Sequence, residues 1–277
     1  MSEAPLSDAP VATADSAPCR EVGFRGGGFL PSPRPLHSWL AFAALLALWQ
    51  AATGLGWIDP VFLPSPLAIA RALWRMAASG ELWRDLSISL LRIGAGWAIG
   101  SALGLTLGLA MGLSSLSRAI GMPLVSSLYP IPKIALLPLL ILWLGIGEAP
   151  KVATIAAGVL FPTAIATFSG VDAAPRSLIR MGQSFGLPAR AIIWKIVLPA
   201  ALPSILAGFR ISISTALLLV VSAEMIGAQF GIGAFLLAAG NLMQSDQLMA
   251  GVVVLSLLGL GLGALLGLVE KAFLKWR

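Results

Sequence analysis

The stretch "SFGLPARAIIWKIVLPAALPSILAGFR", residues 184–210, joins two short basic, amphipathic segments to a long apolar run. Gly186 is typical of a left-handed helix stop, and Pro188 suits the first turn of a helix that follows it. Leu198 and Pro199 are predicted to end that second helix. The pattern therefore predicts a rigid helix–turn–helix with basic flanks, placed between apolar segments.

The composition around this stretch is that of a membrane protein. Of the 277 residues, 58% are hydrophobic and only 11% are charged, whereas soluble domains carry about 25% charged residues. The apolar runs are continuous and lack the alternation of a β-barrel, so we predict an all-α polytopic chain. The net charge of +6 comes from residues between these runs, which favours contact with membrane lipid over nucleic acid.

Six apolar runs approach or exceed the ~20 residues that a helix needs to cross a bilayer. They are residues 39–56, 86–113, 120–146, 152–170, 200–227 and 248–268. Lys and Arg are concentrated between alternate runs, which predicts that both termini are cytoplasmic. We interpret residues 1–38 as a disordered cytoplasmic tail and residues 39–277 as the membrane domain, with residues 171–199 forming a cytoplasmic loop.

The residue types needed for metal binding or catalysis are scarce. Cys19 and His37 are the only cysteine and histidine, so neither a disulfide within the chain nor a His/Cys metal cluster is expected. An intramembrane enzyme would have to rely on Glu224 and Asp246, which are not paired within a span. We predict no catalytic residue, no metal and no cofactor bound by this chain. A passive channel is an alternative that needs no docking loop.

Three further patterns concern packing. Apolar residues at helical spacing after "FLPSP", residues 62–66, predict a short helix on the outer surface that ends at Gly80. That helix packs against the spans or docks an external protein. Glycine recurs every four positions from Gly96 to Gly112, a pattern of close helix packing, within the chain or at a dimer seam. Prolines at 130, 132 and 138 predict an irregular third span.

Four charged residues fall within the predicted spans: Arg92, Lys133, Arg210 and Glu224. Each costs about 2.5–3.5 kcal/mol near the centre of a membrane helix unless it is paired or hydrated. Arg92 and Glu224 lie near outer ends and are candidates for a pair with a structural or a gating role. Lys133 and Arg210 lie toward the inner half. They supply a positive field for an anionic solute, or they snorkel and satisfy carbonyl groups freed by proline.

The spacing Gly-x9-Ile-x-Leu-Pro occurs as Gly186, Ile196, Leu198 and Pro199. It resembles the cytoplasmic EAA loop of ABC importer permeases, which docks into the ATPase subunit. The blocks "FLPSP", "SLLRIGAG", "PIPKIALLPLLILWLGIGEAPK", "LPAALPSILAGFRISI" and "SAEMIGAQFGIG" are similar to the branch that carries aliphatic sulfonates, taurine, nitrate and related small solutes. The resemblance covers roughly residues 58–277.

The Glu-Ala-Ala triplet of this family falls on Arg180, Met181 and Gly182, so a basic residue replaces the acidic one. The resemblance places these three residues in the ATPase-docking loop, together with the Gly-x9-Ile-x-Leu-Pro residues. It implies no detailed charge pairing here, because the acidic residue is missing.

The resemblance implies a permease subunit of the type I ABC importer kind, with about six transmembrane helices, in the bacterial inner membrane. Its implied partners are a second permease copy, two cytoplasmic ATPase subunits and an external solute-binding protein. ATP and Mg²⁺ would be used by the ATPase, because no lysine of this chain lies in a Gly-x-x-x-x-Gly-Lys-Ser/Thr motif. The implied solute is an aliphatic sulfonate or taurine; nitrate, cyanate or a thiamine-precursor pyrimidine is the alternative.

Overall fold

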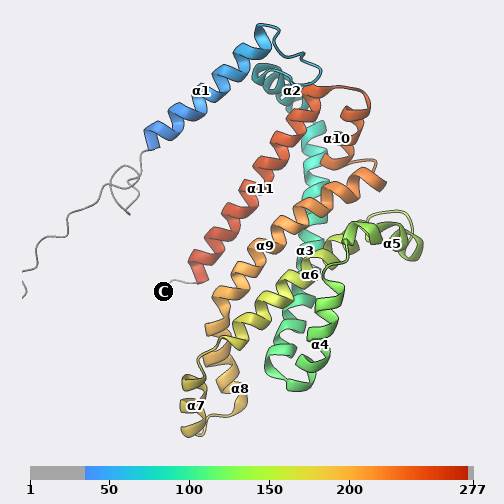
Figure 1. Cartoon of the computed structure of the whole chain (residues 1–277). Coiled ribbons are helices and arrows are strands. Elements are labelled where there is room, and N and C mark those ends of the chain that lie inside the picture. The colour runs from blue at the N-terminus through green and yellow to red at the C-terminus, as the bar shows by residue number, and fades with distance from the viewer. Residues whose placement is uncertain (1–34, 274–277) are drawn as a thin grey trace, which may run out of the picture. The chain divides into compact units, whose positions relative to one another are not determined.

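The computed structural model describes residues 35–273, which form helices joined by turns (Figure 1). The chain divides into residues 1–48 and residues 49–277, and each part is described by itself. The predicted tail lies outside the described residues except for its last four, which begin helix α1 (Pro35–Gly54).

The second part contains eleven α- or 3₁₀-helical elements and one π-helical segment among its described residues. They are α2 (Pro66–Ser79), α3 (Glu81–Leu113), α4 (Ser115–Leu128), η1 (Lys133–Leu136), α5 (Leu137–Leu144), α6 (Ala149–Asp172), α7 (Arg176–Ser184), α8 (Ala189–Ile192), the π-segment η2 (Ile193–Val197), α9 (Leu198–Gly227), α10 (Ile232–Asn241) and α11 (Ser245–Phe273).

Four helices within the described range are long and apolar enough to cross a membrane: α3, α6, the continuous helix 189–227 and α11. The pair formed by α4 and η1–α5 counts as a fifth span, bent by 89°. The first of the six predicted spans corresponds to Trp39–Gly54, a shorter apolar helix. The all-α architecture is as predicted. Among the described residues, four helices, or five with the bent pair, are long and apolar enough to cross a membrane.

The glycine repeat lies in the contact between α3 and α6, so it serves packing within the chain. A Cβ atom on Gly100 would lie 2.5 Å from the Ala156 carbonyl oxygen, and one on Gly104 would lie 2.5 Å from that of Leu160. Gly108 is equally close to the Ala164 carbonyl oxygen. The two backbones approach so closely that only hydrogen fits at these positions.

The direction of α3 and α6 explains the third predicted span. Gly96 faces Ile155 and Gly112 faces Val171, so the two helices run parallel. A parallel pair requires that the chain returns to its starting side between them, and α4, η1 and α5 provide this return. Pro130 and Pro132 lie at the break between α4 and η1, while Pro138 is tolerated in the first turn of α5. The predicted irregularity is confirmed.

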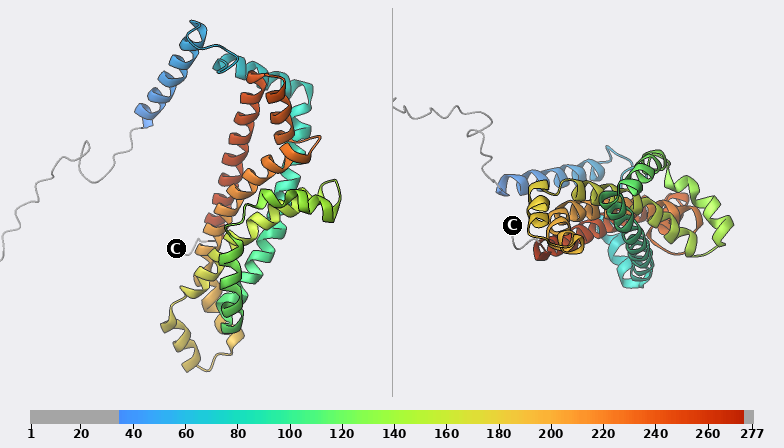
Figure 2. Two further views of the ribbon diagram at one scale, coloured as in Figure 1. Left: turned by 45° about the vertical axis from the view of Figure 1, so that its right-hand side comes forward. Right: turned by 90° about the horizontal axis from the view of Figure 1, so that it is seen from below.

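The other two long helices complete the bundle. Gly170 packs on Ala201 and Gly158 on Leu219, so α9 runs antiparallel to α6. At the end where α9 finishes, α10 turns back along α9 and packs on α11, and α2 covers the same end (Figures 1 and 2). The predicted helix after residues 62–66 is α2; it ends at Gly80, whose φ is +85°, and its inner face packs against the spans. Sequence reasoning missed α10.

The prediction that Leu198 and Pro199 end the second short helix of the loop is wrong. The helix that begins at Ala189 continues to Gly227. In a regular α-helix the ring of Pro199 would clash with the carbonyl group of Lys195. The π-helical turn of η2 immediately precedes Leu198, and its wider hydrogen-bonding pattern accommodates the proline without ending the helix.

Candidate functional site

Arg92 and Glu224 form a buried ion pair near the end of the bundle covered by α2 and α10. The Arg92 Nη1 atom lies 2.8 Å from Glu224 Oε1, and the two side chains are 5% and 0% exposed. Arg92 Nη1 also donates to the Phe230 carbonyl oxygen at 2.7 Å. The pairing suggested by their sequence positions is therefore present, and it links α3 to α9.

The same cluster satisfies the first amide groups of α10. Gly233 donates its N–H to Glu224 Oε2 at 2.8 Å, and Ile232 donates to Ser89 Oγ at 3.0 Å. Gly231 donates to Asp85 Oδ1 at 3.2 Å. Helix N-termini carry unpaired N–H groups and a partial positive charge, so two carboxylates here stabilise α10. Glu224 thus pairs with Arg92 and also caps the N-terminus of α10.

Glu148 is a fourth charged member of this cluster, after Arg92, Glu224 and Asp85, and sequence reasoning missed it. Its carboxylate accepts from Arg92 Nε at 2.5 Å and from Nη2 at 2.7 Å. Glu148 lies in the turn between α5 and α6, outside the long helices, and its hydrogen bond with Arg92 lowers its pKa from 4.5 to about 2. Its position in "GIGEAPK", 56 residues from Arg92, gave no periodic signal of this contact.

Lys133 is held by the break in the third span. Its Nζ donates to the carbonyl oxygens of Leu128, Tyr129 and Ile131 at 2.7–3.1 Å. It also lies 4.6 Å from the centroid of the Phe161 ring. These carbonyl groups are at the end of α4, so Lys133 satisfies acceptors that the broken helix leaves open, as one of the two sequence interpretations proposed.

Arg210 is paired differently. Its Nη2 lies 2.6 Å from Glu270 Oε2, which joins α9 to α11. Sequence reasoning did not foresee Glu270 as its partner. Arg210 and Lys133 therefore contact different elements, and the described structure brings them to no common cluster.

The loop predicted to dock an ATPase projects at the opposite end of α6 and α9 from α10 (Figures 1 and 2). Gly186 has a φ of +70°, which confirms the predicted left-handed stop after α7. Gly182 is buried, because a Cβ there would lie 3.2 Å from Ile196 Cδ1. Helix α7 thus packs on the π-segment η2 through Gly182 and Ile196.

The outer surface of this loop is both apolar and basic. Leu178 is 42% exposed and Phe185 is 79% exposed. Four basic residues, Arg176, Arg180, Arg190 and Lys195, are exposed and form no ion pair with any residue of 35–273. An apolar surface flanked by free cations is typical of a docking site for another protein.

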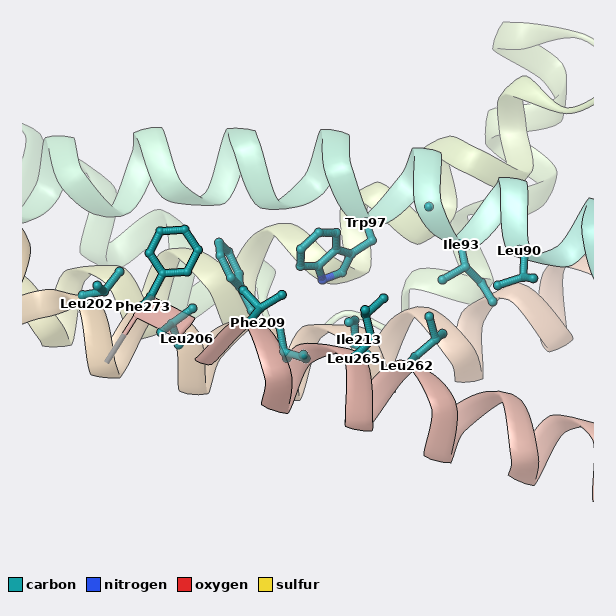
Figure 3. Close-up of a pocket in the computed structure, with 13 residues that line it drawn as sticks. Leu90, Ile93, Trp97, Leu202, Leu206, Phe209, Ile213, Leu262, Leu265 and Phe273 are labelled. Carbon is teal, nitrogen blue, oxygen red and sulfur yellow. The ribbon is translucent and has the colours of Figure 1, made fainter. Parts of the chain in front are cut away.

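An apolar pocket of about 440 Å³ lies between α3, α9 and α11 (Figure 3). Trp97 and Phe209 line it, with their rings edge to face at 5.2 Å. Trp97 donates its Nε1 hydrogen to Ser212 Oγ at 2.9 Å. None of the four charged candidates lines this pocket, so it offers no charge to an anionic solute.

Comparison with known proteins identifies the family. Residues 100–276 match the family described as "Binding-protein-dependent transport system inner membrane component". The chain belongs to this family. Its members are permease components of ABC transporters located in the inner membrane, so the long apolar helices of this chain are membrane spans.

Several curated relatives carry more specific names. The chain is 39% identical over 238 residues to "Putative aliphatic sulfonates transport permease protein SsuC" of Escherichia coli (strain K12), covering 86% of this chain and 90% of that protein. It is 36% identical over 232 residues to "Taurine transport system permease protein TauC" of the same strain, covering 80% and 84%. The predicted resemblance to this branch of permeases is confirmed.

Solved structures support the fold. An inward-facing conformation of the MetNI methionine ABC transporter matches with a TM-score of 0.61 at 19% identity, covering 76% of this chain and 98% of that chain. An amino acid ABC transporter, crystallised with histidines, matches with a TM-score of 0.56 at 16% identity and covers 72% and 97%. The predicted all-α permease fold of ABC importers is confirmed.

Proposed function

We propose that this chain is the membrane-spanning subunit of an ATP-driven importer for a small sulfonate, either an aliphatic sulfonate or taurine. The observation that carries the proposal is the 39% identity that extends over 86% of the chain to an aliphatic sulfonate permease. The taurine permease relative points to the same chemical group, because taurine is also a sulfonate. Solute specificity is shared with the binding protein that delivers the solute.

The partners follow from the two ends of the bundle. Two copies of this chain form the pathway, a cytoplasmic ABC ATPase contacts each copy, and an external binding protein supplies the solute. The exposed basic loop favours the ATPase end, and the clustering of Arg118, Arg176, Arg180, Arg190 and Lys195 near that end favours a cytoplasmic position. ATP and Mg²⁺ are bound by the ATPase, and this chain binds no cofactor.

The motion of the ATPase reaches the permease through the cytoplasmic loop, residues 171–199. ATP-driven closure of the ATPase pair displaces α7 and α8, and the continuous helix 189–227 carries this displacement toward Glu224. A helix without a break at Pro199 transmits such motion better than a flexible linker. The spans then rock between outward-open and inward-open states, as in alternating access.

Growth on a sulfonate tests this function. A deletion strain is grown with ethanesulfonate as its sole sulfur source and with sulfate as the control. We expect growth on sulfate only, and rescue on ethanesulfonate by the intact gene but not by Gly186→Trp, whose φ of +70° disfavours any side chain. Gly263→Trp, in open space on α11, is the matched control and should rescue.

Two outcomes would contradict the proposal. Normal growth of a deletion strain that lacks other sulfonate uptake systems would exclude sulfonate as the solute. Full rescue by Gly186→Trp would exclude a coupling role for the loop. Membrane abundance of each variant is measured in parallel, so that a folding defect is not mistaken for a transport defect.

A further inference from the structure

Arg92 has two carboxylate partners that differ sharply in exposure. Glu224 is 0% exposed, whereas the side chain of Glu148 is 60% exposed. Nη1 of Arg92 is directed to Glu224 and the Phe230 carbonyl oxygen. Among residues 35–273, the hydrogen-bond partner of the other edge of the guanidinium, Nε and Nη2, is Glu148. One edge of Arg92 is therefore fixed inside the protein, and the other is closed by a group that water reaches.

Lys151 is a buried cation with spare hydrogen-bonding capacity. Its side chain is 6% exposed, and within residues 35–273 its Nζ has one hydrogen-bond partner, Glu148 Oε1 at 3.3 Å. An ammonium group carries three N–H donors. Buried lysines are normally paired, so one long contact leaves this group able to accept a further ligand.

The cavity beside Lys151 suits an alkyl group. It has a volume of about 220 Å³ and lies between the α5–α6 turn and the end of α9. Leu137, Ile141 and Ala223 line it, together with Lys151. A cation at the edge of an apolar cavity matches a ligand with an anionic head and a short aliphatic tail.

The backbone around Glu148 allows its carboxylate to move away from Arg92 without disturbing α6. The preceding turn contains Gly145 and Gly147, both with positive φ, and neither has any atom within 4 Å of the place of a Cβ. Ile146 between them is 94% exposed. The Glu148 carbonyl oxygen accepts from Val152 in the first turn of α6, so rotation of the side chain alone releases the carboxylate.

We propose that Arg92 and Lys151 form a binding site for the sulfonate group of the transported solute, and that Glu148 occupies this site until the solute displaces it. This inference rests on the proposed function, which supplies the solute class. Two sulfonate oxygens would accept from Nε and Nη2 of Arg92, as the carboxylate does now, and the third would accept from Lys151. The alkyl group would enter the apolar cavity.

The charges balance in both states. Arg92 and Lys151 are matched at present by Glu224 and Glu148, and the buried carboxylate of Asp85 is matched by Arg84 at 3.5 Å. When Glu148 rotates away, the buried groups keep one net positive charge, which a monovalent sulfonate neutralises. The Glu148 carboxylate is part of the same chain as Arg92 and Lys151, and such a tethered group has an effective concentration in the millimolar range. Free solute therefore competes poorly, and displacement is favoured when a binding protein releases solute directly at this end of the permease.

Removing the resident carboxylate tests the site. The permease–ATPase complex is purified in lipid nanodiscs without binding protein, and ethanesulfonate binding is measured by calorimetry. We expect Glu148→Gln to bind ethanesulfonate at least about tenfold more tightly than wild type, because the competing charge is gone. Glu81→Gln, an exposed carboxylate change at the first residue of α3, is the matched control and should leave binding unchanged.

A second pair of variants assigns the gain to Lys151. Adding Lys151→Gln to Glu148→Gln should abolish the tenfold gain, whereas adding Lys151→Arg should retain most of it. Unchanged affinity in Glu148→Gln, or a gain that survives Lys151→Gln, would overturn the proposal. If Glu148→Gln fails to assemble, Glu148→Asp serves instead: its shorter carboxylate loosens the contact, and it should give a smaller gain that Lys151→Gln also removes.

The result separates this site from the proposed function. If the wild-type gene supports growth on ethanesulfonate but Glu148→Gln shows no gain in binding, the function stands and the site is wrong. If growth shows no sulfonate uptake but Glu148→Gln still gains affinity that depends on Lys151, the site is real and the proposed solute is wrong.

Discussion

The two ends of this permease use the same residue types in opposite ways. At one end, Arg92 is buried and makes contacts with two carboxylates and a carbonyl group. At the other end, Arg180, Arg190 and Lys195 are exposed and unpaired within the described residues. Each end thus has a cluster of charge, but only the first is paired among residues 35–273.

The difference shows how burial decides what a charge does. A buried ion pair is costly to break, because its partner is left as an isolated charge in a medium of low polarity. An exposed charge contributes little to folding, but it steers association with another protein and sets its orientation. The cluster around Arg92 therefore holds helices together, while the basic loop is available to a partner.

Breaking the buried pair should have the largest effect. Arg92→Leu leaves Glu224 buried without its cation and removes the hydrogen bond to the Phe230 carbonyl oxygen, so we expect a loss of about 3–5 kcal/mol in the free energy of unfolding. Thermal unfolding of the purified complex measures it. An Arg92→Leu/Glu224→Leu double variant should recover part of the loss; an unfolding temperature for Arg92→Leu equal to that of wild type would remove the cluster's structural role.

A matched pair of glycine variants compares packing at the two ends. A Cβ on Gly233 would lie 2.5 Å from the Val221 carbonyl oxygen, which is backbone, so Gly233→Ala should cost about 1–3 kcal/mol. A Cβ on Gly182 would lie 3.2 Å from Ile196 Cδ1 and 3.4–3.5 Å from side-chain atoms of Ile192 and Leu187; these are side chains that can shift, so Gly182→Ala should change stability by less than about 0.5 kcal/mol. Equal unfolding temperatures for the two variants would contradict this ranking.

Charge reversal in the loop should separate stability from coupling. Arg180→Glu and Lys195→Glu alter exposed side chains, so each should change the free energy of unfolding by less than about 0.5 kcal/mol. Each should nevertheless weaken association with the ATPase and reduce ATP hydrolysis that depends on solute. Co-purification at low and high salt measures the first effect. Normal co-purification of the double variant would show that the loop does not dock through its charges.

The smallest effect concerns pH. The hydrogen bond from Arg92 lowers the pKa of Glu148 to about 2, so its contribution to stability is complete above the ordinary value of 4.5 and is lost as pH falls toward 2. The difference in unfolding temperature between wild type and Glu148→Gln should therefore be smaller at pH 3 than at pH 5.5. An equal difference at the two pH values would show that the carboxylate is not held by Arg92.

Sequence patterns located elements whose signal is local. The apolar runs predicted α3, α6, α9 and α11, and the prolines predicted the broken helix of the third span. The positive φ of Gly186 and Gly80 also follows from residue type and position. Such signals depend on hydropathy and on backbone sterics within a few residues, so they need no knowledge of distant partners.

Sequence patterns failed where a neighbour changes the outcome. Pro199 is a strong helix breaker, but the π-turn before it keeps the helix intact. The ten-residue helix α10 is too short to stand out as a span, and it is stabilised by side chains of Asp85, Ser89 and Glu224 from elsewhere in the chain. The helix propensity of a short stretch of sequence contains no information about caps that come from distant residues.

The sequence by itself determined the class of protein, its apolar helices and the turn at Gly186, because hydrophobicity and residue type are properties of contiguous residues. Only the tertiary structure decided which charges meet. Residues 92, 148 and 224 are brought together by three different parts of the fold, and the electrostatic energy of a pair depends on distance in space rather than along the chain. The contact of Arg92 and Lys151 with the exposed carboxylate of Glu148 therefore became visible only in the folded chain.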